Sequence, residues 1–230
     1  MINLSDQKYL CLTLDLEKDY GRIDTYNSFK NIRPLLELLK KYNQKLTIFV
    51  TGEILDKQPE IINLFKNYSC EFESHSYFHA AKSQTFIPDK KKEIINAQRA
   101  YFNFFQKQPM GYRAPQGVIS EQEIVWLKEG GFKYSSSLFP SWRPGLFNNV
   151  HRETRPHFKN CGILEIPFSV IPKLRIPIAL SYQQLLGLSC YRTCYYFFGF
   201  PNIIIYDFHL YNLDKTPGKK NLPLYLRLTY

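Results

Sequence analysis

Two histidines and a group of acids have the residue types and spacing that metal-assisted hydrolysis needs. His75 and His79 lie four residues apart, and an acidic stretch near the start of the chain holds Asp15, Glu17 and Asp19. Residues four apart face the same side of a helix, so a helical turn there would aim both imidazoles at one point. A carboxylate from elsewhere would complete a three-ligand metal site with an open position for water.

Two further polar residues follow predicted strands. Arg113 opens the stretch Arg-Ala-Pro-Gln-Gly, where a fixed cation on a rigid loop would pair with a carboxylate and hold it ionised. His209 follows an apolar strand, and a histidine there could protonate a leaving group. Each motif taken alone has an ordinary structural interpretation. Two histidines and one carboxylate also serve non-haem iron oxygenases, so the ligand set does not fix the reaction.

An alternation of strands and helices would position these residues. Strands are predicted at 9–16, 45–50, 70–74, 111–113, 132–135, 162–167 and 203–208. Helices are predicted at 29–42, 59–65, 88–106 and 120–128, the last with a capping box at Ser120 and Glu123. Alternating units of this kind indicate a parallel α/β fold. The polar candidates fall at the carboxyl ends of strands, where α/β barrels place their active sites.

Composition bounds the class of protein. The chain has 230 residues with no evident linker, and we predict one domain spanning 1–230. Its formal net charge is +10, but the basic residues are scattered, which argues against a nucleic-acid interface. Five cysteines without a Cys-x-x-Cys pair predict neither a disulfide framework nor a zinc knuckle. The polar start of the chain lacks the pattern of a signal peptide, so we expect a cytoplasmic protein.

The stretch from Leu185 to Phe200 is rich in Leu, Tyr and Phe. Such a segment is a candidate for peripheral contact with a membrane, which here would be the inner membrane surface. No apolar run is long enough to span a bilayer.

The order of the motifs is more specific than any one of them. An acidic motif follows the first strand, His-x-x-x-His the third, Arg-x-Pro-x-Gly the next helix, and a late histidine ends a strand. This order, over roughly 9–214, resembles the polysaccharide deacetylase family, also called carbohydrate esterase family four. The resemblance implies a distorted (β/α) barrel with fewer than eight strands. It also implies a divalent metal, usually zinc, and removal of acetyl from an N-acetylated sugar.

The resemblance also implies roles, carried over residue by residue. Asp15 would be the general base, with Arg113 orienting it, and His209 would be the general acid. His75 and His79 would be metal ligands. The third ligand would be Glu17, which stands where the family has an aspartate, with Asp19 as the alternative.

Three other positions bear on the site. Relatives often carry an aspartate where Ser135 stands, which places the tuning of the Arg113 network in question. A backbone N–H near Gln116 would bind the oxyanion, and Trp142 is a candidate sugar platform.

We expect an N-acetylated sugar substrate, linked to a nucleotide or a lipid during glycan assembly, because the basic charge suits a phosphate-bearing carrier. Two alternatives stay open. The protein could be a metal hydrolase for another amide or a formyl group, or a catalytically inactive barrel that binds glycan.

Overall fold

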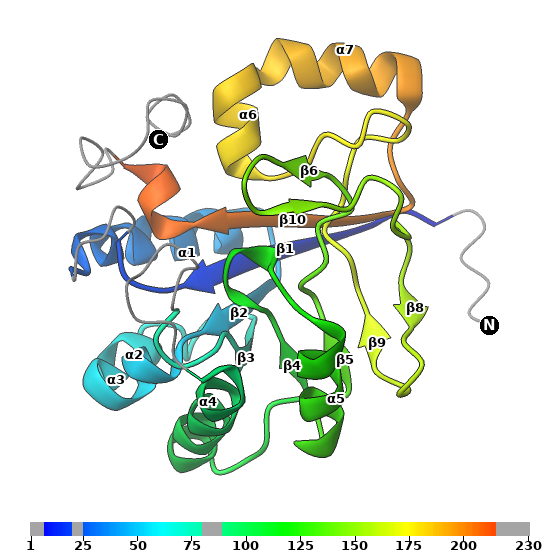
Figure 1. The fold of residues 1–230 in the computed structure, drawn as a ribbon. Helices are drawn as coiled ribbons and strands as arrows, with labels where there is room; N and C mark the ends of the chain where they lie inside the picture. Colours follow the sequence, from blue (N-terminus) through cyan, green and yellow to red (C-terminus); the bar gives the residue numbers. More distant parts are fainter. Residues whose placement is uncertain (1–6, 20–24, 80–88, 215–230) are drawn as a thin grey trace.

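A curled, largely parallel sheet forms the centre of the protein (Figure 1). The structure is a computed structural model, and it describes residues 7–19, 25–79 and 89–214. The sheet order is β10-β1-β2-β3-β4-β5-β9-β8. Its strands are β1 (Tyr9–Leu16), β2 (Leu46–Val50), β3 (Cys70–Ser74), β4 (Gly111–Tyr112), β5 (Tyr134–Ser135), β8 (His157–Phe158), β9 (Leu164–Glu165) and β10 (Ile203–His209). All neighbours run parallel except β8, which pairs antiparallel with β9.

Helices connect successive strands and cover the sheet. They are α1 (Ile32–Lys41), α2 (Gly52–Lys57), α3 (Pro59–Asn63), α4 (Lys90–Phe105), α5 (Glu121–Glu129), α6 (Leu180–Leu186) and α7 (Leu188–Phe198). Short 3-10 turns are η1 (Asn27–Asn31), η2 (Pro115–Gly117) and η3 (Leu210–Leu213). A small hairpin, β6 (Trp142–Arg143) with β7 (Phe147–Asn148), lies outside the main sheet. In the described part of the chain, no helix combines the length and apolarity needed to cross a membrane.

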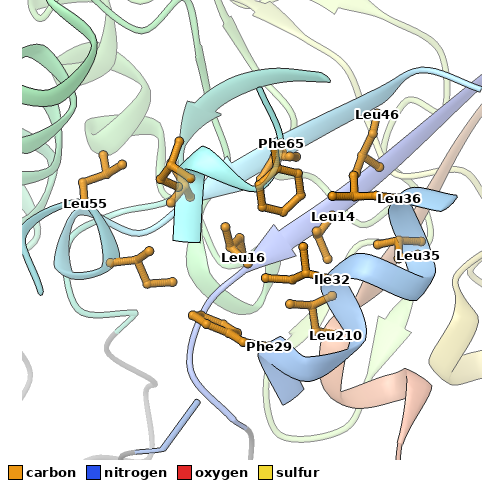
Figure 2. Packing of buried hydrophobic residues seen from close by; sticks show 14 of the residues in the cluster. Leu14, Leu16, Phe29, Ile32, Leu35, Leu36, Leu46, Leu55, Phe65 and Leu210 are labelled. Carbon is orange, nitrogen blue, oxygen red and sulfur yellow. The ribbon is translucent and has the colours of Figure 1, made fainter. Parts of the chain in front are cut away.

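The main core lies between β1 and the helices on one face of the sheet. Figure 2 shows Leu14 and Leu16 of β1 packed against Ile32 and Leu36 of α1, all of them at most 1% exposed. The apolar residues of α1 recur every three or four positions, which puts them on one face of the helix. Burial of this face anchors β1, whose carboxyl end bears the acidic motif.

The predicted fold class is confirmed: the protein has a mixed α/β fold whose central sheet is curled like part of a barrel. The predicted strand number is too low, because the antiparallel edge strand β8 brings the sheet of the described residues to eight strands rather than fewer. Each predicted strand coincides with a strand of the structure, although β4, β5 and β9 are only two residues long. The capping box of α5 is also confirmed, with Ser120 and Glu123 each bonding to the other's backbone N–H. The predicted helix start at 88 lies outside the described residues, and Asp89 caps α4 through the N–H groups of Lys91 and Lys92.

The helices α6 and α7 were not predicted from the sequence. Two further local predictions are wrong. The prediction has no helix at 52–57, where α2 begins directly after β2; six residues are too few for helical periodicity to show. The stretch from His75 to His79 is an irregular loop rather than a helical turn, and Ser76 and His79 have positive φ angles of 63° and 52°.

Candidate metal centre and active site

The register between β1 and β10 determines which side chains lie next to one another in the site. In the parallel pair of β1 and β10, Asp15 lies beside His209, and Thr13 lies beside Asp207. Alternate residues of a strand share one face, so these four side chains project from the same face of two adjacent strands. The carboxyl ends of β1 and β10 thereby bring residues almost 200 positions apart in sequence close together, and His209 Nε2 lies 3.6 Å from Asp15 Oδ2.

The histidine loop reaches the same place because its backbone is held from two sides. The carbonyl groups of Ser76 and Tyr77 accept hydrogen bonds from the N–H groups of Gly52 and Glu53 in the first turn of α2. On the other side, one carboxylate oxygen of the buried Glu93 accepts bonds from Ser76 Oγ and Phe78 N, at 3.0 and 2.9 Å. These bonds fix a loop conformation that puts the two imidazole centroids 5.0 Å apart without a helix.

Three side chains point their ligand atoms at one another. One ligand atom from each of Glu17, His75 and His79 lies within 4.8 Å of the other two. His79 Nε2 is 2.8 Å from Glu17 Oε2. This is a donor set of two imidazoles and one carboxylate.

The fit of this set to a cation can be tested at His75. Its Nδ1 is 2.9 Å from the carbonyl oxygen of Arg113, which can only accept, so Nδ1 carries the proton. Nε2 then bears a lone pair, yet it is buried and has no hydrogen-bond partner. Burial lowers the pKa of His75 to about 4, so the ring is neutral at pH 7. A neutral imidazole oriented by a carbonyl and aimed at a carboxylate and a second imidazole is the arrangement of a metal ligand.

Glu17, not Asp19, joins the two imidazoles. Burial alone would raise the pKa of Glu17, but the His79 imidazole outweighs it and holds that pKa at about 2. Burial likewise opposes charge on His79, and the Glu17 carboxylate raises the pKa of His79 above its ordinary value. Tyr211 also donates its hydroxyl to Glu17 Oε1 at 3.0 Å. The Asp19 carboxylate instead accepts bonds at the start of η1, from Thr25 Oγ1, Asn27 N and Ser28 N.

A fully buried arginine organises the rest of the site. Arg113 Nη1 donates to Asp15 Oδ1 and to Asp207 Oδ1, at 2.8 Å each. The guanidinium carbon lies 4.0 Å from the ring centroid of Phe49 and 4.4 Å from that of Phe168. Planar stacking between two rings leaves the guanidinium little freedom, so the two carboxylates share one fixed cation.

The pKa values of the two carboxyl groups on Arg113 are shifted in opposite directions. Burial would raise the pKa of Asp15, but Arg113, followed by His75 and His209, lowers it to about 2. Burial, together with the charge of Asp15, raises the pKa of Asp207 to about 7. Asp15 is therefore the ionised member of the pair at neutral pH and is available to accept a proton. Its Oδ2 lies 3.6 Å from His75 Nε2 and 3.6 Å from His209 Nε2.

Asp207 is the residue that our sequence interpretation did not place in the site. The available signal was strand alternation, which puts Asp207 on the same face of β10 as His209. Ser135 donates to Ser137 Oγ and brings no charge to Arg113. Asp207 thus supplies the second carboxylate that Arg113 contacts.

The two predicted substrate-binding residues lie outside this polar cluster. Gln116 lies in η2, three residues after Arg113 in the sequence, and has a positive φ of 59°. Trp142 is 62% exposed on the β6–β7 hairpin. The roles that we predicted for both remain predictions.

Comparison with known proteins identifies the family of the chain. The family model described as polysaccharide deacetylase matches residues 5–135, which is more than half of the chain. The chain belongs to the polysaccharide deacetylase family. The matched region contains Asp15, His75, His79 and Arg113, whereas the strand that carries His209 lies beyond it.

Curated members of this deacetylase family match part of the chain. A peptidoglycan-N-acetylglucosamine deacetylase of Bacillus cereus is 28% identical over 98 residues, 43% of this chain and 36% of its own length. A peptidoglycan-N-acetylmuramic acid deacetylase of Bacillus subtilis is 27% identical over 112 residues, 47% of this chain and 43% of its own. The match thus spans less than half of either relative.

Solved structures of the deacetylase family share the fold. A protein from Mycobacterium smegmatis, named as a candidate polysaccharide deacetylase, superposes with a TM-score of 0.60 at 18% identity and covers 97% of this chain and 84% of its own. A family pseudoenzyme from Bacillus anthracis superposes with a TM-score of 0.55 at 12% identity, over 90% of this chain and 58% of its own.

Proposed function

We propose that this protein is a metal-dependent hydrolase that removes acetyl from the nitrogen of an N-acetylated sugar. The observation that carries the proposal is the buried, unpartnered Nε2 of His75, which faces the carboxylates of both Asp15 and Glu17. Family membership and the peptidoglycan deacetylases among the relatives support the same reaction class. We propose zinc as the cation, because two imidazoles and one carboxylate with an open position form a typical catalytic zinc set.

The roles of the residues follow from their contacts. A divalent cation bound to Glu17, His75 and His79 would polarise a water molecule and the acetamide carbonyl. Asp15 takes the proton of the attacking water, since Arg113 holds its carboxylate ionised and fixes one oxygen while the other faces His75. The backbone N–H of Gln116 stays our predicted donor to the oxyanion.

His209 donates a proton to the departing amine. Its Nε2 lies 3.6 Å from Asp15 Oδ2 and 3.4 Å from Glu17 Oε1, so the imidazole borders both the proposed base and the proposed metal ligand. The backbone N–H of His209 donates to Asn212 Oδ1 and thereby fixes the end of β10. The products are acetate and a sugar with a free amino group.

The identity of the sugar is a finer proposal. We propose a glycan precursor carried on a phosphate-bearing nucleotide or lipid, supported by the formal net charge of +10. The cytoplasmic location stays a prediction.

A histidine exchange tests the proposed function. We expect His75→Ala to lose bound zinc and to lower acetate release from N-acetylglucosamine oligomers by about a thousandfold or more. The matched control is His151→Ala, an exposed loop histidine, which should keep both. Metal content is measured by mass spectrometry and product by an acetate assay.

Other outcomes decide between the alternatives. Full activity in His75→Ala would refute the site. Release of formate from a formylated amino sugar, without acetate release, would favour the formyl hydrolase. Stoichiometric zinc without turnover on any acylated sugar would favour the inactive glycan-binding barrel.

A further inference from the structure

The helices α6 and α7 present a cluster of large apolar side chains to solvent. Leu188, Tyr196 and Phe197 of α7 are 67%, 84% and 70% exposed. Leu185 and Leu186 at the end of α6 and Phe200 just after α7 are each more than 40% exposed. We call these six residues the α6–α7 surface. Figure 1 shows α7 as the outermost helix on its side of the sheet.

The inner face of α7 already has its own core. Tyr191 is 1% exposed and packs in a cluster with Ile171 and Ile178, against which Tyr195 and Phe198 also pack. A surface helix normally balances such an inner face with charged residues outside. The exposed side of α7 has only Arg192 as a charge, beside Leu188, Ser189, Thr193, Tyr196 and Phe197.

The contrast with α1 shows that this is a local property. The helix α1 also packs one apolar face on the sheet, but its exposed residues include Arg33, Glu37, Lys40 and Lys41. The outer side of α1 is therefore suited to water. The outer side of α7 is suited to an environment that is partly apolar.

The charged residues near the α6–α7 surface indicate which partly apolar environment it suits. No aspartate or glutamate occurs from 166 to 206, the stretch that contains both helices, whereas Arg192 is exposed on α7. Lys8 adds a cation at 5.6 Å from the ring centroid of Phe200. Leucine and aromatic rings with interspersed cations and without acids are complementary to an anionic lipid surface. A protein partner of comparable apolarity would not require the acids to be absent.

We propose that the α6–α7 surface docks on the headgroup and upper acyl region of an anionic bilayer. The apolar side chains enter the interface, while Arg192 and Lys8 pair with lipid phosphates. At this depth Tyr196 keeps its ring in the apolar region and its hydroxyl in the headgroup layer, whereas Phe197 is apolar throughout.

Hydrogen bonds tie α6, one of the two helices of this surface, to the elements that carry the active site. Gln184 of α6 donates its side-chain N–H to the carbonyl of Asn212, three residues after His209, at 2.7 Å. Gln183 accepts the hydroxyl of Tyr206 on β10 at 2.6 Å. The helix α6 thus contacts both the turn η3 and β10, the strand that bears the proposed general acid. If the proposed function holds, a lipid-linked sugar is the substrate class that this placement favours over a nucleotide-linked one.

Vesicle sedimentation tests the proposal with the full chain. We expect the protein to bind vesicles of phosphatidylcholine mixed with phosphatidylglycerol at least about tenfold more tightly than phosphatidylcholine alone, and less tightly at high salt. Leu188→Ser/Phe197→Ser should weaken binding by about tenfold or more. Arg192→Glu should weaken binding to the anionic vesicles only. The matched controls on α1, Leu38→Ser and Lys41→Glu, should bind like the natural protein.

Three results would overturn the proposal. One is equal binding by Leu188→Ser/Phe197→Ser and the natural chain. Another is no binding to anionic vesicles. The last is a dimer in analytical ultracentrifugation that this double variant dissociates, since the surface would then cover a second copy. Acetate release from a soluble oligomer should be unchanged in the double variant, so failure of docking and failure of the proposed activity give separate readings.

Discussion

The polar cluster has two halves that solve the burial of charge in different ways. In the arginine half, Asp15 and Asp207 share the guanidinium of Arg113, so the protein itself supplies the cation. In the histidine half, Glu17, His75 and His79 converge but leave the lone pair of His75 Nε2 without a partner. A half with its own cation is completed by folding, whereas a half with a spare lone pair is completed by a ligand. The arginine half therefore stabilises the site, whereas the histidine half binds its ligand.

The largest effect should come from removing the cation of the arginine half. We expect Arg113→Met to lower the free energy of unfolding by about 3–5 kcal/mol, because it leaves the buried Asp15 carboxylate without its counter-charge and Asp207 without its hydrogen-bond donor. Urea denaturation of metal-free protein measures this. His75→Gln, in the histidine half, should cost clearly less stability while losing metal. Equal stability of Arg113→Met and the natural chain would remove the distinction between the halves.

Acid should weaken both halves. The pKa values of Asp15 and Glu17 are lowered to about 2 in the folded protein, below the ordinary values near 4 of an unfolded chain. Their contribution is fully present above about pH 4.5 and is lost as the pH falls towards 2, by about 2–3 kcal/mol for each group. Metal-free Glu17→Gln should lose its share of this slope in urea titrations between these pH values. An unchanged slope would contradict the assignment of charge to Glu17.

Asp207 tests whether the arginine half also serves the reaction. We expect Asp207→Asn to lower kcat between about tenfold and a hundredfold with little change in KM or zinc content, because Arg113 loses one of the two carboxylates that orient it. Asp207→Glu should recover part of kcat. The double variant Asp207→Asn/Ser135→Asp moves the carboxylate from β10 to β5. If none of these changes kcat, Asp207 is only a structural partner of Arg113.

The smallest effect should come from the hydroxyl that holds Glu17. Tyr211→Phe removes one hydrogen bond to the proposed third ligand, so zinc affinity should fall by roughly tenfold while stability changes little. Competition with a chromogenic chelator measures the affinity. An affinity equal to that of the natural chain would mean that His79 alone orients the carboxylate.

Much of the fold could be predicted from the sequence because its signals are local. The periodicity of α1 and the apolar run of β10 each follow from the residues in the element itself. The capping box of α5 is another signal of this kind. Acidic residues and histidines that follow predicted strands likewise indicated which side chains come together, because the carboxyl ends of parallel strands lie along one edge of the sheet.

The parts that were missed depend on contacts from elsewhere. The loop of His75 and His79 is shaped by Glu93 and the first turn of α2, so no local pattern could predict its two positive φ angles. Asp207 looked like one polar residue in an apolar strand. Its place beside Arg113 depends on the register with β1, which the sequence does not state.

The pairing of β1 with β10 has a consequence for biosynthesis. A nascent chain that has emerged only as far as β9 would hold the metal-ligand half of the centre but neither Asp207 nor His209, and the outer edge of β1 would still lack its neighbour. The proposed hydrolytic activity would therefore arise late, when translation has delivered β10. Until then the exposed edge of β1 is a point where a chaperone, or a neighbouring unfinished chain, can pair.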